Sequence, residues 1–402
     1  MKKLSPRHSR LLVRRAKSGT IKRKKKSFTA SKKQRSFEVV EVWDGKAVEN
    51  AICYSTPVHP PKSICFNSNT DETLAFLENL RRNVTSRKNA RKKKAGWLDR
   101  RGSGLPRLKN YYDFSKIDKF STGPALVIGA LYERAKEAIG KIPPAVDFPH
   151  WSPQAFQTLY EIGFFEIIGH APAEKIREVY VEKKDTTYKV SKILTGRNAD
   201  GLEDASNVIL ELLNYLSVEP ETSDDLITDI NSAVSEAMIN VARHAYPSQF
   251  VDSSPNHCLL QWWMSAKADK GSNTLTIVIY DQGATIPGTL PRRDWFFETV
   301  EAAMQAMIPD YDLGRESGTI DHEFINYSMK KGKTQTNDAR RGLGLPQMQS
   351  LIDICPDGTL SILSRRGLYK YGKGMGVFKR SLDYELEGTL IEWELTLPGR
   401  RT

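Results

Sequence analysis

The sequence DDLITDINSAVSEAMINVARHAY, residues 224–246, has the pattern of an amphipathic helix whose polar face carries reactive groups. Glu236, Asn240 and His244 are four residues apart, so on an α-helix of 3.6 residues per turn they project from one face. The opposite face is apolar, as expected for a helix that packs on a sheet. A carboxylate and a carboxamide one turn apart can hold a water and Mg²⁺ side by side. An ordinary helix with a solvent-exposed polar face has the same pattern.

A predicted strand in residues 274–287, TLTIVIYDQGATIP, also ends in a polar group. Its apolar side chains alternate with other residues, and it runs into Asp281, Gly283 and Ile286. An aspartate at a strand end can present its carboxylate to the amino group of a base, while glycine lets backbone approach a ligand closely. Taken alone, Asp-x-Gly also fits a simple turn.

Glycines open a further predicted helix in residues 340–351, RRGLGLPQMQSL. Gly342 and Gly344, followed by Leu345, expose backbone N–H groups that can bind phosphate with the help of the helix dipole. A single Gly-x-Gly pair is weak evidence for such a site. The order of the three stretches along the chain carries more information than any one of them.

In this order the stretches resemble the Bergerat-fold (GHKL) ATPases, the family of gyrase, histidine kinases and MutL. A fourth element completes the resemblance: Gly388-Thr389 leads into a predicted final strand, LIEWELTLP. The resemblance covers about residues 200–399. It implies an α/β sandwich with a mixed sheet and helices on one face, and it implies binding of ATP and Mg²⁺.

The resemblance also implies residue roles. Asn240 is expected to ligate Mg²⁺ and Asp281 to recognise the adenine amino group. Glu236 is expected to be the general base, for hydrolysis or for phosphoryl transfer. The remaining residues expected to brace the site or contact the nucleotide are His244, Gly283, Ile286, Gly342, Gly344, Leu345 and Thr389.

Residues 288–341, between the two glycine stretches, occupy the position of the lid in this family. Compact anti-sigma kinases of the family have shorter lids. Three cations near the second glycine stretch are candidates for contacting the γ-phosphate, as cations that stabilise a transferred group do: Lys333, Arg340 and Arg341. Each of them also fits a solvated loop.

The region before the ATPase-like part loosely resembles a STAS domain, the sheet-and-helix module of anti-sigma antagonists, over about 60 residues. The matching motif is Phe120-Ser121-Thr122-Gly123, where the antagonists carry Asp-Ser-Ser-Gly and are phosphorylated on serine. By this resemblance Thr122 is a candidate phosphoacceptor. The aspartate is missing here, and Ser121 or Thr122 can instead cap a helix.

Positive charge is concentrated at one end of the 402-residue chain. Residues 1–110 hold 29 Lys and Arg against 8 Asp and Glu, whereas the remainder has a net charge of −9. Residues 1–36 contain no acidic residue and are too poor in apolar residues to fold alone. Together with residues 81–107 they can bind nucleic acid. A solubilising tail without a dedicated partner fits as well.

No stretch of about 18 apolar residues is present, so we expect no transmembrane helix. The four cysteines lack metal-ligand spacing and fit a reducing cytoplasm. The predicted α/β (α+β) chain has five parts: a basic disordered tail (1–36), a basic globular or loop segment (37–107), a STAS-like α/β domain (108–175), a linker (176–200), and an ATP-binding domain (201–402) that includes a lid (288–341).

Three functions remain open. The first is a cytoplasmic bacterial regulator that uses ATP binding, hydrolysis or phosphoryl transfer to switch a protein partner, as an ATPase or a serine/threonine protein kinase. The second is an ATP-gated clamp on nucleic acid with slow ATPase activity, supported by the basic end and the long lid. The third is a module that binds ATP without chemistry, against which Glu236 argues. Whether two chains must pair to close the lid, as a homodimer, is also open.

Overall fold

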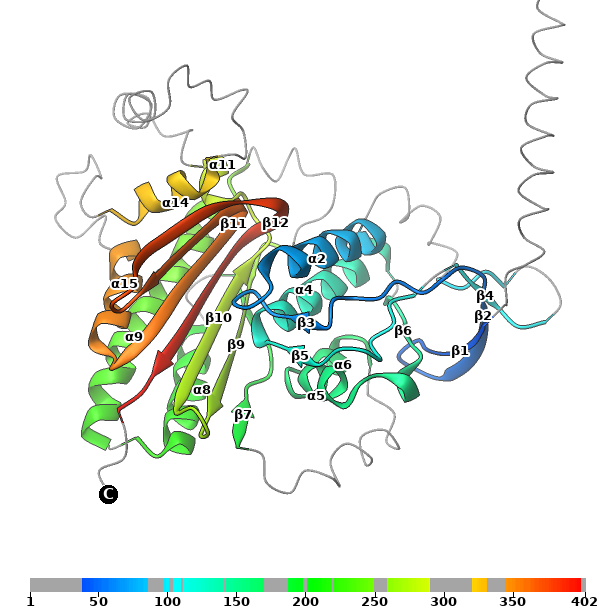
Figure 1. Ribbon diagram of the computed structural model, residues 1–402, viewed down its shortest axis with the longest axis horizontal. Helices are drawn as coiled ribbons and strands as arrows, with labels where there is room; N and C mark the ends of the chain where they lie inside the picture. Colours follow the sequence, from blue (N-terminus) through cyan, green and yellow to red (C-terminus); the bar gives the residue numbers. More distant parts are fainter. Residues whose placement is uncertain are drawn as a thin grey trace, which may run out of the picture.

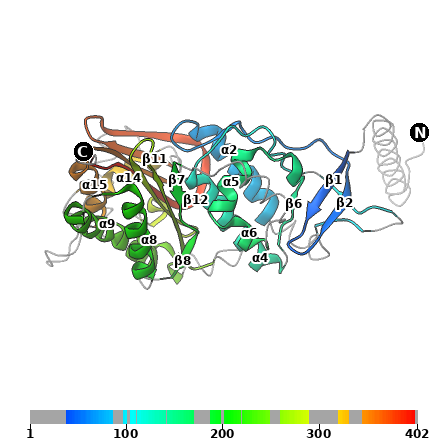
Figure 2. The ribbon, with the colours of Figure 1, turned by 90° about the horizontal axis from the view of Figure 1, so that it is seen from below.

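The chain is elongated, with a large sheet at one end, helices in the middle and a small sheet at the other end (Figures 1 and 2). The structure, a computed structural model, describes these residues: 38–85, 97–100, 104–109, 111–140, 142–169, 187–197, 201–218, 220–248, 259–289, 320–330 and 344–398. Among the helices of these stretches, none combines the length and apolar character needed to cross a membrane.

The large sheet has six strands in the order β11-β12-β10-β9-β7, with β8 also paired to β9. Every pairing described in it is antiparallel. Its central strands are long and apolar, and tight hairpins join β9 to β10 and β11 to β12. The strand bounds are β7 (Tyr188–Val190), β8 (Leu194–Gly196), β9 (Trp262–Asp269), β10 (Thr274–Asp281), β11 (Asp357–Gly372) and β12 (Gly376–Thr396).

Three amphipathic helices cover one face of the large sheet: α8 (Leu202–Leu216), α9 (Pro220–Asn240) and α15 (Gly344–Ile354). Side chains alternate across a strand, so every second residue of β10 points to these helices. Ile277 and Ile279 accordingly share a fully buried core with Ile230 of α9 and Ile352 of α15. The short helices α11 (Ile286–Thr289) and α14 (Asp321–Ser328) lie near the end of β11. The α/β layering expected from the sequence is therefore present.

The other face of the large sheet is covered as well, by α2 (Thr70–Thr85) and α4 (Thr122–Ile139). Val278 and Tyr280 of β10 alternate with the residues just described, and they belong to a second core. That core continues into α5 (Pro153–Glu161) and α6 (Phe164–Ile167). A strand buried on both faces is apolar at nearly every position, which explains the composition of TLTIVIY. The large sheet is thus the middle of three layers.

Two small sheets complete the N-terminal part. One has the order β4 (Arg107–Leu108), β2 (Val48–Cys53), β1 (Glu38–Trp43) and β6 (Ala145–Val146). The other pairs β3 (Ser63–Ile64) with β5 (Lys119–Phe120) in parallel. These pairings, and the packing of α2 on α4, join the segments predicted separately as 37–107 and 108–175. We refer to the described residues 38–169 as the N-terminal module.

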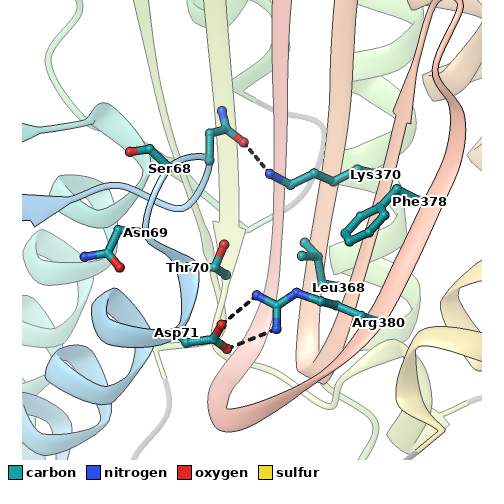
Figure 3. A pocket seen from close by; sticks show the side chains of 9 residues that line it. Ser68, Asn69, Thr70, Asp71, Leu368, Lys370, Phe378 and Arg380 are labelled. Carbon is teal, nitrogen blue, oxygen red and sulfur yellow. Dashed lines mark hydrogen bonds and ion pairs between the residues drawn. The ribbon is translucent and has the colours of Figure 1, made fainter.

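A cavity of about 310 Å³ lies where the start of α2 meets the β11–β12 hairpin (Figure 3). Two contacts tie its walls together across the module boundary. Arg380 of β12 forms an ion pair with Asp71 of α2, with an N–O distance of 2.7 Å. Lys370 of β11 donates to Asn67 at 3.0 Å. The contact between the N-terminal module and the large sheet is therefore polar at this rim and apolar inside.

Candidate functional site

Three polar side chains meet at the same level of three neighbouring strands. Asp281, the last residue of β10, pairs in register with Thr389 of β12, and Thr389 pairs with Ser364 of β11. The hydroxyls of Ser364 and Thr389 are 2.8 Å apart. Ser364 also accepts a hydrogen bond from the backbone N–H of Ile286, at 3.0 Å. Ser364 was missed by the sequence analysis, although a polar residue inside an otherwise apolar strand is a usable signal.

The carboxyl group of Asp281 is almost completely removed from solvent. Its Oδ1 accepts a hydrogen bond from the N–H of Gly283 at 2.8 Å. Burial raises the pKa of Asp281 to about 7, since the charged form loses its hydration, and the backbone hydrogen bonds offset only part of this effect. A buried carboxyl with remaining acceptor capacity suits a neutral hydrogen-bond donor such as the amino group of a base.

Helix α9 brings Glu236 and Asn240 to the site, both partly buried. Burial raises the pKa of Glu236, and the charge of Arg243 together with the Asn240 amide partly opposes this. The Asn240 Nδ2 atom is buried and makes no hydrogen bond of normal geometry to the described residues. A buried amide in this condition is one that an external ligand can satisfy.

The helix departs from the straight α-helix predicted for 224–246. It is α-helical to Asn240 and widens into a π-turn over Val241–Ala245, leaving His244 exposed. The Ala245 carbonyl accepts from the N–H of Ala284 at 2.5 Å instead of continuing an α-helix. Gly283 allows this approach, because a Cβ there would lie 2.2 Å from the Ala245 oxygen. Glu236 and Asn240 thus stay together on α-helix, while His244 follows on a turn of different pitch.

Two consecutive hydrogen bonds through the Tyr246 hydroxyl support the turn after Asp281. The N–H of Gln282 donates to the Tyr246 hydroxyl at 3.2 Å, and this hydroxyl donates to the carbonyl of Gln261 at 2.8 Å. Gln282 itself is fully buried. Its role could not be found from the sequence, because its partners come from distant parts of the chain.

The other predicted site residues are distributed as follows. Gly344 is the first residue of α15. Leu345 packs against the core on the face of the sheet that α8, α9 and α15 cover. Ile286 begins α11 beside Ser364. Four further predictions lie outside the described residues: Lys333, Arg340, Arg341 and Gly342.

Thr122 lies far from solvent, at the first position of α4, with 6% of its surface exposed. Ser121 holds the N-cap position, but its side chain makes no capping hydrogen bond. The neighbouring Gly123 packs against Phe66 and the carboxyl of Glu392, which a Cβ would approach to 2.6 Å. Burial raises the pKa of Glu392 to about 7. Thr122 is therefore buried, and the adjacent Gly123 contacts Glu392 of β12.

Residues 200–360 match the family model of the histidine kinase-like ATPase domain. This match supports a GHKL-type ATPase domain in the same part of the chain that holds α9, β10 and the start of α15. A domain of this type implies ATP binding, usually with Mg²⁺. The match does not reach the N-terminal module, where the STAS-like resemblance stays a prediction. No curated protein matches the chain.

The side chains present suit these ligands. Asn240 lies one helical turn from Glu236, so an amide oxygen that can ligate a cation and a carboxylate that can hold a water are adjacent. The Asp281 carboxyl lies beside the hydroxyls of Ser364 and Thr389, in register on neighbouring strands. Together they form an acceptor-rich end of the sheet for a base.

Proposed function

We propose that this protein binds ATP and Mg²⁺ at the end of the large sheet and uses ATP binding, hydrolysis or phosphoryl transfer to switch a protein partner. The observation that carries the proposal is that Asp281 pairs with Thr389 while Ala245, in the turn after α9, contacts the segment that follows Asp281. Asp281 and α9 lie within the residues that match the ATPase family. The N-terminal module is in direct contact with the same sheet, so a partner-binding change has a physical route to the nucleotide.

Each side chain has one task in this proposal. Asp281 accepts a hydrogen bond from the adenine amino group, and Asn240 offers an oxygen to Mg²⁺. Glu236 removes the proton from the attacking water or hydroxyl, which its raised pKa favours. Bound ATP supplies the transferable phosphoryl group, and Mg²⁺ supplies charge neutralisation. His244, Gly283, Ile286, Gly344 and Leu345 shape the surroundings.

The proposal is tested by incubating the full chain with γ-labelled ATP and Mg²⁺ and separating free phosphate from protein-bound label. A Glu236→Ala variant is the control and is expected to lose about 10²- to 10⁴-fold in rate, the usual contribution of a general base. Free phosphate indicates hydrolysis, and label on protein indicates kinase-type transfer. Label on the protein is then mapped, with Thr122 the first residue examined by mass spectrometry.

Three other outcomes change the conclusion. ATP binding without release or transfer of phosphate, in both wild type and Glu236→Ala, supports a non-catalytic ATP-binding module. No detectable binding of ATP by the folded chain in the presence of Mg²⁺ contradicts the proposal altogether. Stimulation of phosphate release by added DNA or RNA supports the clamp on nucleic acid.

A further inference from the structure

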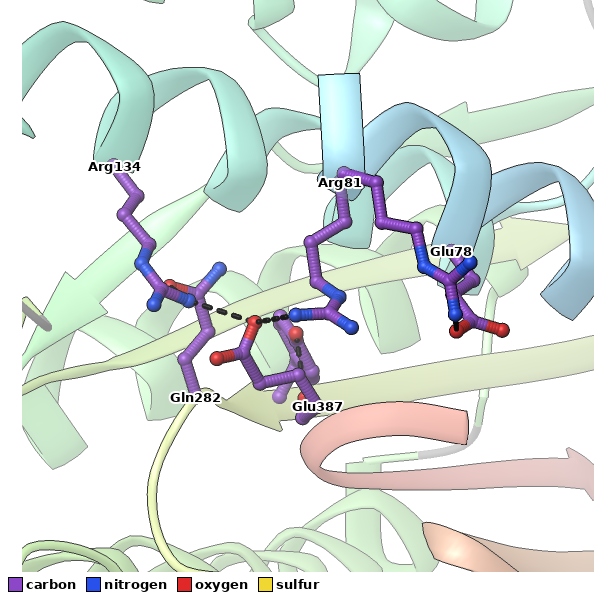
Figure 4. Close-up of polar contacts among 7 residues, drawn as sticks. Glu78, Arg81, Arg134, Gln282 and Glu387 are labelled. Atoms are coloured by element: carbon purple, nitrogen blue, oxygen red, sulfur yellow. Dashed lines mark hydrogen bonds and ion pairs between the residues drawn. The ribbon is translucent and has the colours of Figure 1, made fainter. Parts of the chain in front are cut away.

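A buried arginine of the N-terminal module, Arg134, reaches Gln282 and Glu387, which lie next to Asp281 and Gly388-Thr389 in the sequence (Figure 4). Arg134 of α4 has 1% of its side chain exposed. Its guanidinium lies 2.9 Å from the carboxylate of Glu387 and within 3.5 Å of the Gln282 side-chain oxygen. Arg81 of α2 approaches the same carboxylate of Glu387 at 3.5 Å. Two helices of the N-terminal module therefore each place a guanidinium group beside Glu387 of β12.

Holding the module in place is a poor explanation for Arg134. Burying a charged pair costs hydration energy that its attraction only partly recovers, so apolar residues of similar size often stabilise as well or better. The module already docks through an extensive apolar core that includes Val278, Tyr280 and Leu390 of the sheet. What an arginine adds is a rigid planar fork that fixes the direction of several acceptors at once.

The acceptors of Arg134 belong to the two segments that carry the proposed nucleotide residues. Gln282 directly follows Asp281, and Glu387 of β12 directly precedes Gly388-Thr389. The two segments are in backbone contact, since a Cβ on Gly388 would lie 1.8 Å from the Asp281 carbonyl oxygen. Tyr280 adds a hydrogen bond from its hydroxyl to the Glu387 carbonyl at 2.8 Å. A shift of either acceptor would therefore move Asp281 relative to Thr389.

Glu133, which precedes Arg134 in α4, supports the Asp281–Gln282 turn through a second set of hydrogen bonds. The Glu133 carboxylate accepts from the Trp263 indole at 2.7 Å and from the Gln261 amide at 3.3 Å. The carbonyl of Gln261 in turn holds the Tyr246 hydroxyl to which the N–H of Gln282 donates. Two consecutive residues of α4 thus constrain the Asp281–Gln282 turn.

We propose that Arg134 is a positioning residue for the nucleotide site, acting from outside the ATPase-like domain by fixing the turn that carries Asp281 against Thr389. This inference rests on the ATP binding proposed above. It assigns to the N-terminal module a share in recognising the adenine base. By the same coupling, nucleotide binding stabilises the docked position of α4, because coupling between two sites is reciprocal.

The test compares binding of ADP and IDP to the full chain with Mg²⁺, by calorimetry. IDP carries a carbonyl oxygen where ADP has the amino group that Asp281 is proposed to bind, so the ratio of affinities reports recognition of this edge of the base. Arg134→Met keeps volume and removes the fork. We expect it to reduce the preference for ADP about tenfold, the scale of one hydrogen bond to a charged group. Arg134→Lys should restore part of the preference.

Arg380→Met is the matched control, because it removes another ion pair of the same interface, at the cavity rim and away from Asp281. It should leave the ADP preference unchanged. Equal loss of ADP and IDP affinity in Arg134→Met would overturn the inference. A reduced preference for ADP in Arg380→Met, as large as in Arg134→Met, would overturn it as well. If Arg134→Met does not fold, Gln282→Met decides, since it breaks the link to the turn while keeping the ion pair to Glu387. A wild type that binds neither nucleotide refutes the proposed function itself, a result distinct from unchanged discrimination.

Discussion

Two carboxyl groups of the site, Glu236 and Asp281, are shifted toward their protonated forms by burial, but with different consequences. Glu236 keeps contact with solvent and with the charge of Arg243, so it can exchange protons during a reaction. Asp281 is enclosed, with 5% of its surface exposed. The difference in their surroundings supports the proposal of a reactive role for Glu236 and a recognition role for Asp281.

The raised pKa of Glu236 predicts the acid side of the pH–rate profile. A general base acts only when deprotonated, so turnover should decline at a pH above the ordinary glutamate value of 4.5. Arg243→Ala removes the charge that lowers this pKa, and we expect the decline to move to still higher pH. The pH dependence of kcat/KM for phosphate release measures both. An identical profile in the two proteins would contradict the role of Glu236.

Asp281→Asn tests the cost of the buried carboxyl. Because its pKa is raised from 3.8 to about 7, the folded state binds the proton more tightly than the unfolded state. Stability contributed at acidic pH is then lost as the pH rises from about 4 to about 7. The asparagine variant should therefore gain stability over wild type at pH 8 but not at pH 4, by a few kcal/mol at most, while losing ADP binding. Urea unfolding at the two pH values measures the difference, and an equal difference at both would argue against a raised pKa.

Among the secondary-structure elements, the closest backbone approach is at Gly388 in β12, where the pairing of β12 with β11 shifts register. Gly388 has φ +85°, and a Cβ there would collide with the Asp281 carbonyl. Gly376, in the hairpin between β11 and β12, has φ +70° but open space around it. Gly376→Ala should cost about 1–2 kcal/mol of unfolding free energy from backbone strain alone. Gly388→Ala should cost at least about 2 kcal/mol more, and it alone should weaken ADP binding.

Urea unfolding and ADP titration of both glycine variants check this prediction. Similar losses of stability in the two proteins would mean that the backbone at residue 388 can move away from Asp281. The joint between α9 and the Asp281 turn is built in the same way, through the Ala245 carbonyl and Gly283. Both joints place a glycine where one backbone passes another.

For the whole molecule, the decisive feature is that both faces of the large sheet are buried. A chain beginning at residue 187 would expose Trp263, Val278, Tyr280 and Leu390, which now pack against α2 and α4. Such a contiguous apolar face favours association. We therefore expect the shortened chain to bind a hydrophobic dye and to elute as aggregates in size-exclusion chromatography, unlike the full chain. A monomeric, dye-free fragment with full ADP affinity would show that the N-terminal module is dispensable.

Much of the ATPase-like part could be predicted from the sequence. The spacing of Glu236 and Asn240, the strand ending at Asp281, and the order of the glycine stretches are local patterns. These patterns were sufficient to predict the α/β layers and the elements α9, β10 and β12 that carry the proposed site residues. The exact course of α9 was not predictable, because its π-turn arises from hydrogen bonds to a loop distant in sequence.

What the sequence determined by itself was the set of elements and the chemical groups at their ends, since periodicity and capping depend on neighbouring residues. Only the tertiary structure decided what lies on the second face of the sheet. Val278 and Tyr280 read simply as strand residues, and Arg134 as a charge on an apolar helix. Their burial and pairing depend on segments 130 residues or more apart. Contacts of that range leave no local pattern, and for that reason the support of Asp281 by the N-terminal module emerges only in the folded chain.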